Sequence, residues 1–169
     1  MARATFDAGP FLLVPRVVPD AVVAGLGLAS RDDDAKVRVA AIYALGVLAR
    51  PPLEPATGLA LAAALADEKT DVRVASATVL GALRVASAGD ALVTAMNDKD
   101  AEVRRAAMRA LGDIRETRAQ QALTEHLAFY RKGRMAEAAL DGLARLGQPS
   151  SRPVFEQYAN DKNEVLRRR

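Results

Sequence analysis

A motif that recurs three times along the chain constrains the fold more than any other feature. Each copy starts with an aspartate, continues with Val-Arg after four further residues and closes around Leu-Gly, as in DDDAKVRVAAIYALGVL, DEKTDVRVASATVLGAL and DKDAEVRRAAMRALGDI. The copies begin at Asp32, Asp67 and Asp98, so the steps between them are 35 and 31 residues. Repeats of this length indicate an array in which every copy is one structural unit.

The spacing of apolar residues predicts that each copy contains a helix. In the third copy these residues recur at i, i+3, i+4, i+7, i+8 and i+11, on one helical face: Val103, Ala106, Ala107, Ala110, Leu111 and Ile114. A shorter amphipathic segment, Ala91–Met96, precedes them, and the polar turn 97–100 separates the two. Each unit is therefore predicted to be a helical hairpin. The four extra residues of the first step fall in the proline-rich link 50–55.

Two weaker copies follow the three regular ones. The fourth lies between Leu123 and Gly147 and lacks the Val-Arg pair. The fifth begins at Arg152, and its NDKNEVLRR segment, from Asn160, echoes NDKDAEVRR from Asn97. A hairpin cannot bury its apolar stripe alone, but stacked neighbours form a continuous core. We therefore expect a solenoid over 19–169, with units at 19–50, 55–86, 88–116, 118–147 and, incomplete, 151–169. Residues 1–18 are expected to be a proline-interrupted segment or cap.

The shared frame, D-x-x-x-x-VR-x-A-x-x-x-x-LG, resembles HEAT repeats of the short bacterial class named after phycobilisome lyases. The resemblance implies an all-α, right-handed α-solenoid of four to five repeats, each a pair of antiparallel helices whose second helix lines a concave face. It also implies a ladder of hydrogen bonds between the interior arginines and turn aspartates of successive units. Carried over to this chain, Arg38, Arg73 and Arg104 would pair with turn acids such as Asp32, Asp67 or Asp98 and their neighbours.

The residues offer little for catalysis. The chain has no cysteine and a single histidine, His126, so it lacks the ligands of a zinc site, and no GxSxG elbow presents a serine nucleophile. The acidic turns at 32–34 and 97–100 lack the glycine and the terminal glutamate of a calcium loop. We therefore expect a protein that is not an enzyme and has no cofactor. A phycobilin lyase or related chaperone, suggested only by the class name, would need a tetrapyrrole-binding cysteine or histidine pair.

Charge and hydropathy narrow the classes of partner. The 24 basic and 21 acidic residues give a net charge of +3 and are interleaved, which is weaker than the basic field of a general nucleic-acid binder. Nucleic-acid binding stays the alternative, through Arg105, Arg109 and the basic residues 167–169. No apolar run reaches the roughly 20 residues of a membrane span. Prolines interrupt the run Phe11–Val14, so we predict no signal peptide and a cytoplasmic location.

Projection of the second helices predicts which side chains line the concave face. Between the buried positions lie Val39, Tyr43, Val47, Val74, Thr78, Ala82, Arg105, Arg109, Asp113, Glu137, Asp141 and Arg145. The first half of this stripe is apolar and the second half is charged, and contiguous exposed apolar surface usually marks a contact.

Two interpretations of the stripe remain open. In one, a protein partner binds at Val39, Tyr43, Val74 and Thr78, and Arg105 and Arg109 meet an acidic segment of that partner. In the other, Phe11–Val14 folds over the stripe or caps the first repeat. The incomplete fifth unit suggests a further contact, since an uncovered end carrying Val165 and Leu166 would favour end-to-end self-association.

Overall fold

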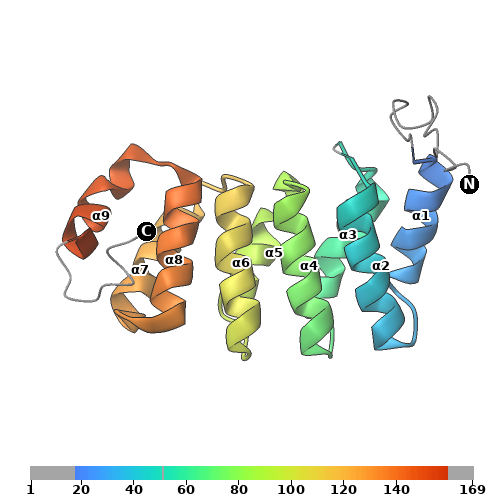
Figure 1. The fold of residues 1–169 in the computed structure, drawn as a ribbon, viewed down its shortest axis with the longest axis horizontal. Coiled ribbons are helices and arrows are strands. Elements are labelled where there is room, and N and C mark those ends of the chain that lie inside the picture. The colour runs from blue at the N-terminus through green and yellow to red at the C-terminus, as the bar shows by residue number, and fades with distance from the viewer. Residues whose placement is uncertain (1–17, 51, 160–169) are drawn as a thin grey trace, which may run out of the picture.

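The computed structural model describes residues 18–50 and 52–159, and these residues form helices and turns without a strand (Figure 1). Four helical hairpins follow one another: α1 (Asp20–Ala29) with α2 (Ala35–Leu48), α3 (Pro55–Ala63) with α4 (Thr70–Ala82), α5 (Gly89–Ala95) with α6 (Ala101–Asp113), and α7 (Ala119–Tyr130) with α8 (Gly133–Leu146). Helix α9 (Arg152–Ala159) comes last. Three short 3₁₀ turns adjoin these helices: η2 (Ala64–Ala66) follows α3, η3 (Ala86–Ala88) precedes α5, and η4 (Pro149–Ser151) precedes α9. The predicted all-helical solenoid is confirmed.

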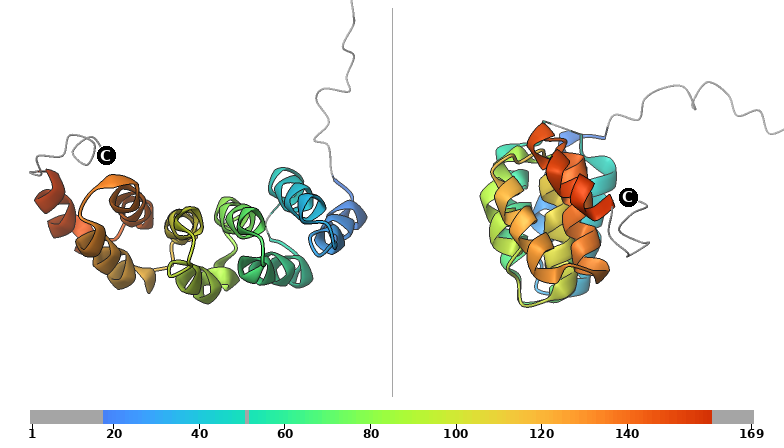
Figure 2. Two further views of the ribbon diagram at one scale, coloured as in Figure 1. Left: turned by 90° about the horizontal axis from the view of Figure 1, so that it is seen from below. Right: turned by 90° about the vertical axis from the view of Figure 1, so that its left-hand side faces the viewer.

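The hairpins stack side by side into an arc of two layers. Helices α2, α4, α6 and α8 form the inner layer on the concave side, and α1, α3, α5 and α7 form the outer layer (Figure 2). The expectation that second helices line the concave face therefore agrees with the structure. The turns that join the two helices of each hairpin lie along one edge of the arc, the lower edge in Figure 1.

The repeated apolar residues form the continuous core. The leucines of the Leu-Gly pairs, Leu45, Leu80 and Leu111, are fully buried, as are the valines Val72 and Val103. The equivalent first valine, Val37, is 39% exposed, because its hairpin has a neighbour on only one side within the described part. Burial of these side chains between neighbouring hairpins is the main stabilising contribution.

The glycine of each Leu-Gly pair lets successive inner helices approach closely. A Cβ atom added to Gly81 would lie 2.8 Å from the Cα of Ala110, and one added to Gly112 would lie 2.6 Å from the carbonyl oxygen of Gly142. The contact at Gly46 is with the Val79 side chain, 3.0 Å away. Real side-chain carbons do not pack this tightly against backbone, so the stacking distance itself requires glycine.

Two inner helices end in the same way, with an arginine in the left-handed region. After α4, Arg84 has a φ of 53° and its N–H donates to the Gly81 carbonyl, while after α6, Arg115 has a φ of 56° and donates to Gly112. A 6→1 bond, such as that from Val85 N–H to Leu80, completes each Schellman motif. Helix α8 uses glycine instead, at Gly147 with a φ of 68°.

None of the described helices is long and apolar enough to cross a membrane. Three predictions concern residues outside the described part of the chain. They are the cap formed by Phe11–Val14, self-association through Val165 and Leu166, and the basic residues 167–169.

Candidate functional site

The turn arginines tie each hairpin to the next one. Arg38 donates from Nη2 to Asp67 Oδ1 at 2.9 Å, and from Nη1 to the backbone carbonyls of Asp32 and Asp33 in its own turn. Its Nε lies 2.8 Å from Asp67 Oδ2, within ion-pair distance but without the alignment of a hydrogen bond. Of the acids that the sequence left open, the acceptor is thus the aspartate of the following unit.

Arg73 repeats this arrangement one unit further along. Its Nε and Nη2 donate to the two carboxylate oxygens of Asp98 at 2.8 and 3.0 Å, and its Nη1 donates to the carbonyls of Asp67 and Glu68. Partial burial acts to raise the pKa of Asp98, but hydrogen bonds from Arg73 and from the Asp100 N–H outweigh it and hold that pKa below the ordinary value. The pKa of Asp67 is lowered for the same reasons, against the same effect of burial, by Arg38 and the Lys69 N–H.

Arg104 ends the series. Its Nη1 donates to the carbonyls of Asp98 and Lys99 at 2.7 and 3.1 Å, as the other two arginines do in their turns. When the starts of α6 (Ala101) and α8 (Gly133) are aligned, the residue equivalent to Asp98 is Tyr130, so the fourth hairpin has no aspartate at this position. The buried Nε of Arg104 has no hydrogen-bond acceptor among the described residues.

On the concave face, four of the six predicted partner-binding residues line one pocket. Val74 and Thr78 from α4 lie opposite Arg105 and Arg109 from α6, around a cavity of about 200 Å³ that reaches Arg145. The other two, Val39 and Tyr43, are on α2 and do not line this pocket. The side chain of Tyr43 is 46% exposed, and Val47, one turn further along α2, is 69% exposed.

The charged half of the stripe is paired within the protein. Arg105 forms an ion pair with Glu102, and only 12% of its side chain is exposed. It is therefore less accessible than the helical projection predicted. Arg109 lies 3.4 Å from Asp141, which also lies 3.2 Å from Arg145. Of these pairs, the one between Arg109 and Asp141 joins α6 to α8 across the face.

The second ion pair between these helices is formed by Arg145 and Asp113 at 2.6 Å. Hydrogen bonding to Asp113 raises the pKa of Arg145, and a weaker effect of burial opposes it. Together with the bonds of Asp141, this pair links the third and fourth hairpins on their concave side.

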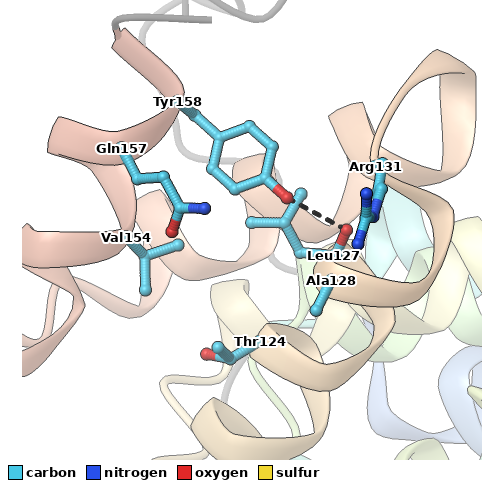
Figure 3. Close-up of a pocket in the computed structure, with 7 residues that line it drawn as sticks. All are labelled: Thr124, Leu127, Ala128, Arg131, Val154, Gln157 and Tyr158. Carbon is cyan, nitrogen blue, oxygen red and sulfur yellow. Dashed lines mark hydrogen bonds between the residues drawn. The ribbon is translucent and has the colours of Figure 1, made fainter.

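A further pocket, which the sequence did not predict, lies between α7 and α9. Figure 3 shows Val154, Gln157 and Tyr158 of α9 facing Thr124 and Ala128 of α7 across a cavity of about 320 Å³. The Tyr158 hydroxyl donates to the carbonyl of Leu127 at 3.2 Å, where α7 ends, and Arg131 lines the same opening.

His126 is set in α7 against aromatic and charged neighbours. Its ring stacks on that of Tyr130 with centroids 6.0 Å apart. Burial lowers the pKa of His126, and the nearby charge of Arg104 lowers it further, whereas Glu125 acts in the opposite direction. Among the residues that the structure describes, no group of three or more histidine, aspartate or glutamate side chains is placed to hold a metal ion.

Comparison with known families decides the class of these hairpins. Residues 58–134, from α3 to the first turn of α8, match the family described as HEAT repeats. The hairpins within this range are therefore similar to HEAT repeats. A search of curated proteins gave no match to the chain.

Among solved structures, 22 chains match this one. One belongs to the complex of CpcE and CpcF of phycocyanin lyase from Nostoc sp. PCC7120, with a TM-score of 0.71 and 22% sequence identity. The match covers 99% of this chain and 66% of that one, so the chain spans about two thirds of its structural neighbour. The likeness is one of fold, and it agrees with the resemblance predicted from the Val-Arg and Leu-Gly frame.

Proposed function

We propose that this HEAT-repeat protein is a non-enzymatic interaction scaffold that binds a protein partner on the concave face formed by α2, α4, α6 and α8. The observation that carries the proposal is the exposed apolar surface of α2, where Tyr43 and Val47 face away from the core. A half-exposed tyrosine next to an aliphatic side chain is the kind of residue that dominates protein interfaces. The solved neighbour belongs to a complex of two proteins, CpcE and CpcF, which supports a protein as the partner class.

The pocket between α4 and α6 supports the same surface. Val74 and Thr78 continue the stripe from α2 to α4, and the rim is made of ion pairs rather than free charges. A carboxylate of the partner would have to compete with Asp141 for Arg109. The charged half therefore serves as a polar rim around an apolar centre, which is the usual layout of a protein interface.

Nucleic-acid binding through Arg105 and Arg109 has less support. Phosphate binding relies on basic side chains that are free to release counterions. Arg105 is paired with Glu102 and Arg109 with Asp141, so neither offers an unopposed charge.

The proposal is tested by comparing how tightly a partner binds to variants in the inner layer and to a variant in the outer layer. The tagged protein is incubated with native lysate, and the retained protein is identified and then purified. With that partner, Tyr43→Ala and Arg109→Ala should each weaken binding at least tenfold without changing the thermal midpoint. Leu59→Ala is the matched control, since Leu59 is 67% exposed but lies on α3 in the outer layer. Equal binding by the Tyr43 variant and the native protein would refute the concave site.

A further inference from the structure

We propose that Arg104 anchors a second site, on the turn edge of the solenoid, which binds a carboxylate presented by an acidic segment of a protein partner. This site is separate from the concave face and does not depend on the function proposed for it. The inference starts from the two complete steps of the ladder, in which an arginine holds its own turn with Nη1 and the next turn's aspartate with its remaining nitrogens.

Arg104 has the first half of this arrangement and lacks the second. Its Nη1 is fixed by two backbone carbonyls of the α5–α6 turn, so the guanidinium is held in the same way as that of Arg73. Its Nε is buried with no acceptor in the described part of the chain. Unlike Arg38 and Arg73, Arg104 has only backbone acceptors among the described residues, so a carboxylate that pairs with its guanidinium would displace no existing ion pair.

The acids near Arg104 in sequence already have other partners. Asp98 accepts from Arg73, Asp100 accepts from the first N–H groups of α6, and Glu102 pairs with Arg105. Within residues 18–50 and 52–159, none of these carboxylates bonds to the Arg104 guanidinium. The guanidinium of Arg104 is therefore held in place without a carboxylate partner among the described residues.

The surroundings add positive charge instead of removing it. The α7–α8 turn, on the same edge as the α5–α6 turn, carries the exposed residues Arg131 and Lys132, and the exposed Arg134 follows at the start of α8. A carboxylate is the ligand of choice because it fills the equivalent place at Arg38 and Arg73, where it matches the planar fork of the guanidinium. Several neighbouring cations favour an acidic segment over a single carboxylate, since each further pair strengthens binding.

The test uses the full chain, a hexaglutamate peptide and two NMR signals. The Nε–Hε resonance of Arg104 reports the guanidinium directly. The resonance of His126 reports its charge, because His126 is the only histidine and its pKa is lowered partly by Arg104. We expect the peptide to shift the Arg104 signal in a saturable way and to raise the pKa of His126, since a bound carboxylate neutralises the nearby charge.

Two variants connect the signals to the site. Arg104→Met should raise the Kd for the peptide at least tenfold and abolish the response of His126. Tyr130→Asp places a carboxylate at the position that aligns with Asp98, so it should raise the His126 pKa without peptide and should block peptide binding while Arg104 is still present. Arg109→Met, on the concave face, is the matched control and should leave the Kd unchanged.

Three further probes separate the sources of the anion. Acetate should bind at Arg104 at least tenfold more weakly than the peptide, and inorganic phosphate and an oligothymidylate should not compete with the peptide. The proposal is overturned if the Arg104 signal does not move, if the peptide binds the Arg104 variant equally well, or if the oligonucleotide binds this site more tightly. Since Tyr43→Ala leaves this edge intact, failure of the concave site would not change these results.

Discussion

The guanidinium of Arg73 and the carboxylate of Asp98 meet through two parallel hydrogen bonds, of 2.8 and 3.0 Å, with only 4% and 13% of the side chains exposed. This pair fastens the start of α4 to the turn before α6. It is a bond between units rather than within one, so the ladder reinforces the stacking of the hairpins.

Loss of Arg73 should therefore destabilise the array. Arg73→Met leaves Asp98 without its cation and should lower the free energy of unfolding by about 1 to 3 kcal/mol, less than for a fully buried pair because Asp98 keeps contact with water. Urea denaturation followed by circular dichroism measures the change. Arg118→Met is the control, since Arg118 pairs with Glu116 and Asp90 but is 67% exposed, and it should leave the midpoint nearly unchanged. Equal effects of the two variants would contradict a structural role of the ladder.

The ladder also predicts how stability depends on pH. The pKa values of Asp67 and Asp98 are lower in the folded protein than the ordinary aspartate value, so both carboxylates bind protons more readily after unfolding. Their contribution is complete above the unfolded pKa, about 4, and is lost as the pH falls through the folded values. Denaturation midpoints measured from pH 6 down to about pH 2 should fall steeply for the native protein and less steeply for Asp98→Asn. The same slope in both proteins would mean that other carboxylates account for acid unfolding.

Glycine at the stacking positions should be indispensable. Gly112→Ala places a methyl group 2.6 Å from the Gly142 carbonyl oxygen, which forces α6 and α8 apart and should cost about 1 to 3 kcal/mol. Gly25→Ala is the matched control in α1, where an added Cβ meets nothing within 4 Å and the better helix propensity of alanine should add about 0.5 to 1 kcal/mol. Thermal unfolding of the two variants should shift in opposite directions. A stabilising effect at Gly112 would refute the close approach.

The arginine at the end of α6 offers a stabilising change. Arg115 has a φ of 56° and is exposed, and a residue with a side chain in the left-handed region costs more than glycine does. Arg115→Gly should raise the free energy of unfolding by about 0.5 to 1 kcal/mol, after allowance for the greater freedom of glycine in the unfolded chain. Arg115→Ala keeps the unfavourable φ and should give no such gain in the same thermal scan.

Much of the architecture follows from the repeated motif. The apolar spacing placed the second helices correctly, because one face of each must be buried between neighbours. The direction of the ladder could not be predicted, since every unit contains both an aspartate and an arginine. An arginine that pairs with the aspartate of its own unit and one that pairs with the aspartate of the next unit have the same sequence pattern. The structure shows that Arg38 pairs with Asp67 of the next unit.

The candidate site was predicted less completely. Tyr43 is exposed as expected, whereas Arg105 is largely covered because it folds back onto Glu102 one turn earlier in its own helix. The pocket between α7 and α9 left no signal, since it depends on where Tyr158 meets the end of α7. The lack of an aspartate partner for Arg104 did leave a signal, because Tyr130 takes the place of the turn aspartate when the repeats are aligned.

The cross-links between hairpins change place along the arc. Between the first three hairpins they lie on the turn edge, at Asp67 and Asp98, whereas the third and fourth are joined across the concave face through Asp113 and Asp141. A partner that draws Arg109 or Arg145 towards itself would therefore act on the joint as well as on the surface. Binding of a partner on the concave side would then change the angle between α6 and α8. The curvature of the solenoid would depend on whether the partner is bound.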